Sequence, residues 1–158
     1  MLDSMMRMKP VMLLWAGCLL CFPLGAQTAK PDAGVPYFQT LVRDARTRIR
    51  EINATQIEAL RKATPTLVLV DVREDSEWVR KRIPGAVHVG RGVLEMSIES
   101  KVPAKSTPIV VYCQGGGRSA VAADVLGKMG YTNVSSLAGG LAGYEASGLP
   151  VDNASTAK

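Results

Sequence analysis

The stretch that begins at Cys113 combines a nucleophilic residue type with a backbone able to bind an anion. The consecutive glycines Gly115, Gly116 and Gly117 remove the side chains that would block a curled backbone, so successive N–H groups can point at one anion. Arg118 closes the stretch as Cys-x4-Arg and adds a full positive charge. These groups stabilise a thiolate better than a thiol. The spacing therefore predicts a reactive cysteine that works on small anions.

Cys113 follows one of two apolar runs that end in polar residues. Residues 66–72 and 108–113 are β-branched and aliphatic, as in strands buried on both faces of a parallel sheet. Asp71 and Arg73 lie at the end of the first run. Ligands collect beyond the carboxyl ends of strands in such sheets, so we expect Asp71, Arg73 and Cys113 along one edge.

Strands alternate with helical patterns along the rest of the chain. We expect helices over 37–50, 54–63, 74–82 and 118–128, with Asn53 as the cap of the second. Further strands are expected at 51–52, 86–89 and 134–137. In the first helix Phe38, Leu41, Val42, Ala45 and Ile49 form the apolar face, and in the third Trp78 and Val79 face inward. This order predicts an α/β fold, an open parallel sheet of about five strands with helices on both faces.

Residues 1–26 have the layout of a secretory signal peptide. Arg7 and Lys9 precede an apolar run of about 14 residues, and small residues follow at Gly25 and Ala26. That run is shorter than the roughly 20 residues of a membrane-spanning helix. We expect cleavage after Ala26, a periplasmic or secreted protein and no stable membrane insertion afterwards. An uncleaved anchor and lipidation at Cys18 are the alternatives.

Cleavage would remove Cys18 and Cys21 and leave Cys113 without an internal disulfide partner. The mature chain is expected to comprise a leader with an accessory helix (27–49), one domain (50–152) and a disordered tail (153–158). The whole chain of 158 residues has a net charge of +5, but its basic residues are scattered among acidic ones. This balance suits small anionic substrates and gives no support for nucleic-acid binding.

The order of motifs resembles the rhodanese family of sulfurtransferases across roughly residues 50–151. Asp71-Val72-Arg73 is similar to the Asp-x-Arg that ends a strand in that family, and Cys113 to Arg118 is similar to its six-residue active loop. The Ile-Pro-Gly-Ala turn and the closing segment agree as well, at residues 83–86, 139–140 and 148–150. Lys81-Arg82 and Tyr144 depart from the common pattern, which has Gly-His and Trp there.

The resemblance implies a rhodanese-like sheet and transfer of a sulfane sulfur from a donor such as thiosulfate to a thiophilic acceptor. Cys113 would be the nucleophile and would carry the sulfur as a persulfide, with no metal or organic cofactor. The backbone N–H groups of residues 114–118 (Gln114, Gly115, Gly116, Gly117 and Arg118) would hold the anionic sulfur, and the side chains of Arg118 and Arg73 would orient the sulfonate end of the donor. Asp71 and Ser119 would support the loop. His88 is expected to be structural.

Two other functions remain open at this point. The chain could be a persulfide-carrying or partner-binding module with little turnover alone, whose acceptor is another protein. Cysteine phosphatases carry Cys-x5-Arg, and the shorter Cys-x4-Arg loop here suits a sulfur atom better than a tetrahedral phosphate.

Overall fold

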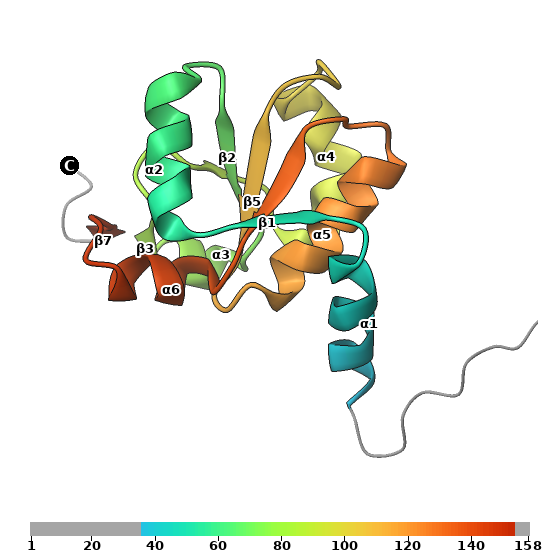
Figure 1. Ribbon diagram of the computed structural model, residues 1–158, viewed down its shortest axis with the longest axis horizontal. Coiled ribbons are helices and arrows are strands. Elements are labelled where there is room, and N and C mark those ends of the chain that lie inside the picture. Colours follow the sequence, from blue (N-terminus) through green and yellow to red (C-terminus); the bar gives the residue numbers. More distant parts are fainter. Residues whose placement is uncertain (1–35, 154–158) are drawn as a thin grey trace, which may run out of the picture. The chain divides into compact units, whose positions relative to one another are not determined.

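The computed structural model describes residues 36–153, which form a central parallel sheet covered by helices (Figure 1). The five strands lie in the order β1-β6-β5-β2-β4, and every neighbouring pair is parallel. This confirms the predicted α/β sheet. The strands are β1 (Arg50–Ile52), β2 (Val68–Asp71), β4 (Val87–His88), β5 (Ile109–Tyr112) and β6 (Val134–Leu137).

The two central strands bury side chains on both faces, as their unbroken apolar sequences predict. Val70 and Val111 point to the face covered by α4 (Leu94–Lys101) and α5 (Gly117–Lys128). Leu69 and Val110 point to the opposite face, covered by α2 (Ala54–Ala63) and α6 (Gly140–Ala146). Asp71 pairs in register with Tyr112, so the two strands end together and place their following residues at one edge.

A local hydrogen-bonded cap determines where α2 begins. The Asn53 side chain accepts a hydrogen bond from the Gln56 N–H, and the Gln56 side chain accepts one from the Asn53 N–H. This reciprocal cap starts α2 where it was predicted. Helices α4 and α6 and the short 3₁₀ turn η1 (Arg91–Val93) were not predicted.

The first helix, α1 (Tyr37–Arg46), ends four residues earlier than expected and packs against α5 (Figure 1). Val42 and Ala45 are buried, as the pattern predicts, whereas Phe38 and Leu41 are 52% and 51% exposed. Arg48, just after α1, makes two hydrogen bonds of 2.8 and 3.0 Å to Asp124 of α5. The helix is therefore attached to α5 by apolar contacts and an ion pair.

The helix predicted over 74–82 is wrong in its second half. It is the single turn α3 (Asp75–Trp78), and Val79 is exposed, not inward-facing. Lys81 and Arg82 instead form β3 (Lys81–Arg82), which pairs antiparallel with β7 (Asp152–Asn153). The chain's local charge pattern could not show this pairing, because the partner strand lies some 70 residues away in sequence.

The expected signal peptide and most of the leader lie outside the described residues, as do residues 154–158 of the expected tail. Asn153, the first residue of that expected tail, belongs to β7 and pairs with Lys81 of β3. Between residues 36 and 153, no helix has the length and apolar character needed to span a membrane.

Candidate active site

The loop after β5 curls around the sulfur atom of Cys113. Gly116 adopts a left-handed conformation with φ of 88°, which glycine reaches without steric cost, and α5 begins at the next residue. The Gly116 N–H donates a hydrogen bond of 3.2 Å to the Cys113 Sγ atom. The first N–H groups of α5 have no acceptor within their own helix. The sulfur therefore lies at a helix N-terminus, a position that favours negative charge.

The glycine pair Gly139-Gly140, where α6 begins, packs against the start of this loop. The Leu141 N–H donates a 2.8 Å hydrogen bond to the Cys113 carbonyl oxygen, and the Ala142 N–H donates a 3.0 Å bond to that of Gln114. This contact requires glycine at position 140, where a Cβ atom would lie only 2.7 Å from the Gln114 carbonyl oxygen. The N-terminus of α6 thus fixes the start of the active loop.

Ser119 fixes the other end of the loop. Its hydroxyl donates to the Gly116 carbonyl oxygen at 3.1 Å and accepts a 2.9 Å hydrogen bond from the hydroxyl of Ser136 on β6. Both serines are buried. These contacts are consistent with the expected supporting role of Ser119, and they connect the loop to the neighbouring strand.

Asp71 and Arg73 form a buried ion pair beside the loop. The Asp71 carboxylate accepts hydrogen bonds of 2.6 to 3.0 Å from the guanidinium and of 2.9 Å from the Arg73 N–H. Arg73 is 2% exposed, and its guanidinium also contacts the Lys81 carbonyl and, at 3.5 Å, the Gln114 side chain. Arg73 thus lies beside the loop, bonded to β3, and is not among the residues that line the cleft next to Cys113. These contacts favour a positioning role.

Arg118 is paired with a carboxylate that the sequence did not indicate. Its guanidinium makes hydrogen bonds of 2.7 and 2.8 Å to the two carboxylate oxygens of Glu77 in α3. These bonds hold the pKa of Glu77 at about 2, and the pairing raises the pKa of Arg118, with a further contribution from Cys113. Arg118 therefore adds less positive charge to the site than its type alone suggests.

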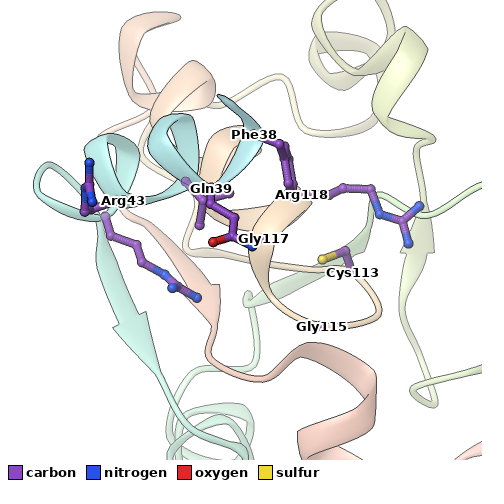
Figure 2. A pocket seen from close by; sticks show the side chains of 9 residues that line it. Phe38, Gln39, Arg43, Cys113, Gly115, Gly117 and Arg118 are labelled. Atoms are coloured by element: carbon purple, nitrogen blue, oxygen red, sulfur yellow. The ribbon is translucent and has the colours of Figure 1, made fainter. Parts of the chain in front are cut away.

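A cleft of about 630 Å³ opens beside Cys113, between the loop and α1 (Figure 2). In Figure 2 the Cys113 Sγ atom points to the side where Gln39 lies, whereas the Arg118 side chain extends away from α1. The cleft is lined by four residues of the loop region and five of α1, namely Cys113, Gly115, Gly117, Arg118, Phe38, Gln39, Val42, Arg43 and Arg46.

The five α1 residues are the part of the site that sequence reasoning missed. Their amphipathic spacing showed that a helix would form and which face would be apolar, but not which element it would pack against. Gly117 gives the physical basis of the packing, because a Cβ atom there would lie 3.2 Å from the Phe38 ring. Glycine at the first position of α5 thus leaves room for α1.

The remaining singled-out residues are structural. His88 stacks on Trp78 at 5.0 Å, and one ring nitrogen lies 2.9 Å from the Arg73 carbonyl oxygen. Tyr144, in place of the expected Trp, is buried and donates a 2.8 Å hydrogen bond to Glu58.

Among residues 36–153, no cluster of three or more His, Cys, Asp and Glu side chains could hold a metal ion.

The sequence matches the Rhodanese-like domain family over residues 53–147. The chain belongs to this family. A sulfurtransferase of Allochromatium vinosum is 30% identical over 103 residues, which cover 65% of this chain and 94% of that protein. The thiosulfate sulfurtransferase PspE of Escherichia coli is 35% identical over 72 residues, 46% of this chain and 68% of PspE. The family and these relatives support sulfur transfer as the general activity of this chain.

Solved structures agree with the rhodanese-like fold. A thiosulfate sulfurtransferase from Pseudomonas aeruginosa superposes with a TM-score of 0.62 and 34% identity, over 66% of this chain and 20% of that one. RPA3614 from Rhodopseudomonas palustris, described as a protein of unknown function and possible tyrosine phosphatase, superposes with a TM-score of 0.65 and 28% identity. That match covers 78% of this chain and 99% of RPA3614. The family match begins at residue 53, so α1 lies outside it.

Proposed function

We propose that the protein moves a sulfane sulfur from thiosulfate to a thiophilic acceptor through a persulfide on Cys113. The observation that carries this proposal is the 3.2 Å hydrogen bond from the Gly116 N–H to the Cys113 Sγ atom at the N-terminus of α5. A hydrogen-bond donor and a helix N-terminus both favour negative charge at this position, and the thiolate is the nucleophilic form of cysteine.

In the donor step, the Cys113 thiolate attacks the outer sulfur of thiosulfate. A Cys113–sulfur bond forms, the sulfur–sulfur bond of thiosulfate breaks, and its electron pair leaves with sulfite. The charge of the persulfide replaces that of the thiolate, so the N–H groups at the start of α5 stabilise the reacting sulfur throughout. The backbone of residues 114–118 supplies these donors, and no further oxidant is needed.

The ion pairs around the loop favour sulfur transfer over phosphate ester hydrolysis. A phosphatase uses a protonated acid to supply the leaving group with a proton. Glu77 is the carboxylate bonded to Arg118, and its pKa of about 2 keeps it ionised at neutral pH. Asp71 is committed to Arg73 in the buried pair. Neither carboxylate offers a proton to a leaving group at the mouth of the cleft.

The deciding experiment incubates the protein with thiosulfate, measures sulfite release and determines the mass of the intact protein by mass spectrometry. We expect a mass gain of one sulfur atom on Cys113, removed by cyanide with formation of thiocyanate. Stoichiometric loading with little turnover would instead support a persulfide carrier that needs a partner protein. Absence of loading by thiosulfate would overturn the proposed donor, and hydrolysis of a phosphate ester that depends on Cys113 would support the phosphatase.

We also propose that the protein is exported and cleaved near Ala26. Support comes from the signal-like order of residues 1–26, with basic residues, then an apolar run, then small residues. Mass spectrometry of the protein from fractionated cells tests this proposal. A chain that retains residues 1–26 in the cytoplasm would contradict it.

A further inference from the structure

A series of hydrogen bonds connects the sheet with the surroundings of Cys113. The hydroxyl of Ser136 on β6 lies 2.9 Å from the hydroxyl of Ser119 on α5, which lies 3.1 Å from the carbonyl oxygen of Gly116. The N–H group of the same Gly116 donates to the Cys113 Sγ atom at 3.2 Å. Ser136 is therefore connected to Cys113 through Ser119 and the backbone of the loop, without touching the sulfur atom.

The number of protons assigns the donors in this series. Each serine hydroxyl has a single proton to donate. The carbonyl oxygen of Gly116 can only accept a hydrogen bond, so the proton of Ser119 is used there. The bond between the two hydroxyls must then be donated by Ser136. Ser136 thus fixes the direction in which Ser119 donates.

Ser136 is a polar residue in an apolar layer. It is fully buried and pairs in register with Val111, whose side chain belongs to the core between the sheet, α4 and α5. Packing alone favours an apolar side chain at such a position, because a buried hydroxyl without a partner is costly. The bond to Ser119 satisfies the hydroxyl and gives it a role that packing does not.

The carbonyl group of Gly116 is held by two donors. Its oxygen accepts from Ser119 and, at 3.1 Å, from the N–H group of Ala120 one turn into α5. These bonds fix the peptide group between Gly116 and Gly117 with its oxygen toward the body of the helix. In a planar trans peptide the N–H group points the opposite way. The Gly117 N–H is thereby directed to the N-terminal end of α5, where the Cys113 sulfur lies.

We propose that Ser136 is a positioning residue for sulfur transfer, which acts through Ser119 to hold Gly116 and the N–H groups at the start of α5. This inference rests on the proposed sulfur transfer through Cys113, and it adds a residue outside the active loop on which the rate depends. The N–H groups stabilise the charge on the reacting sulfur, so misplacing them lowers the rate constant of the chemical step more than the affinity for the donor.

The test compares two variants that differ in one hydroxyl. Ser136→Thr and Ser136→Val introduce side chains of nearly the same shape, so any strain from the added carbon is common to both, and only Thr retains the donor. We expect the single-turnover rate constant of sulfite release from thiosulfate to be about fivefold lower in the Val variant than in the Thr variant. The thiosulfate concentration that gives the half-maximal rate should agree within about twofold.

A double-mutant cycle identifies the route. Ser119→Ala should lower the rate constant about tenfold, and Ser119→Ala/Ser136→Ala should lower it no further, because Ser136 acts only through Ser119. Ser135→Ala is the matched control. Ser135 is the buried neighbour of Ser136 on β6, but it pairs with Val110, whose side chain belongs to the core on the opposite face of the sheet. This variant should keep the rate constant of the unmodified protein.

Alkylation of Cys113 by iodoacetamide gives a second readout that needs no sulfur donor. Without the Ser136 hydroxyl the N–H groups that favour negative charge are less well placed. The pH profile of alkylation should therefore lie about half a pH unit higher in Ser136→Val than in Ser136→Thr. If the unmodified protein releases no sulfite from thiosulfate, the proposed donor is wrong, and the alkylation profiles still test the role of Ser136.

Equal rate constants for the Thr and Val variants would overturn the inference, as would equal alkylation profiles where thiosulfate is not a donor. Additive losses in Ser119→Ala/Ser136→Ala would overturn it too, because Ser136 would then act independently of Ser119. Urea unfolding gives the folded fraction of each variant under the assay conditions. A rate difference that disappears after correction for this fraction would show a merely structural role and also overturn the inference.

Discussion

Gly140, the first residue of α6, lies against the carbonyl group of Cys113, with no room for a side chain between them. The Leu141 N–H donates to that carbonyl at 2.8 Å, so the N-terminus of α6 helps to fix the position of Cys113. The glycine pair of the closing segment is thus part of the active-site architecture.

Gly140→Ala should destabilise the protein by about 2–4 kcal/mol, because φ is 58° and the new Cβ would overlap backbone atoms. Urea unfolding measures the change, and sulfite release should fall with it. Gly127→Ala is the matched control, since Gly127 is a helical position with open space around it and Ala favours helix by up to about 1 kcal/mol. Equal effects of the two substitutions would contradict the role given to Gly140.

Cys113→Ser should abolish sulfite release from thiosulfate and the mass gain, while the melting temperature changes by only a few degrees. The serine hydroxyl occupies a similar volume and can accept the Gly116 N–H, but it is not ionised by these donors. Retained turnover in the Ser variant would exclude Cys113 as the sulfur carrier.

Removing Arg118 should lower kcat/KM for thiosulfate more than removing its ion-pair partner does. In Arg118→Ala the Glu77 carboxylate stays ionised and unpaired near the site, where it repels the anionic donor, so we expect about a tenfold loss. The double variant Arg118→Ala/Glu77→Gln should recover part of this loss, and Arg118→Lys should lie between wild type and Ala. Additive effects of the two single substitutions would show that the pair does not act as a unit.

Asp71→Asn should destabilise the fold by about 3–5 kcal/mol, because it leaves the Arg73 guanidinium charged and buried without its carboxylate. Urea unfolding at neutral pH provides the measurement. If Arg73 instead served mainly to bind the donor, Asp71→Asn would change KM for thiosulfate and leave stability nearly unaltered.

Stability should fall as the pH drops below about 4.5. The pKa values of Glu77 and Asp124 are lowered from 4.5 and 3.8 to about 2 by their arginine partners Arg118 and Arg48. A carboxyl whose pKa is lower in the folded state stabilises the fold above its unfolded pKa and loses this contribution as pH approaches the folded value. Asp124→Asn should cost about 1 kcal/mol at pH 7 and only a small part of that near pH 2, as followed by urea unfolding across this range. A cost that is independent of pH would argue against the Arg48–Asp124 ion pair.

The sequence by itself determined the sheet and the place of Cys113 and its glycine-rich loop at the end of a central strand. Apolar runs that end at Asp71 and Tyr112 define strands buried on both faces, and Asn53 and Gln56 cap α2 through contacts within four residues. Three successive glycines after Gln114 permit a curled backbone, and Gly116 adopts it with φ of 88°. These features depend on local conformation and periodicity, which a sequence displays directly.

Only the tertiary structure decided what faces Cys113 and which charges remain available there. Glu77 forms an ion pair with Arg118, and Asp71 forms one with Arg73. Lys81 and Arg82 pair with β7 instead of ending a helix. The apolar pattern of α1 could not show that its Phe38 packs against Gly117 of α5. These contacts depend on how the elements pack around the sheet. Residue type and spacing along the chain therefore could not predict them.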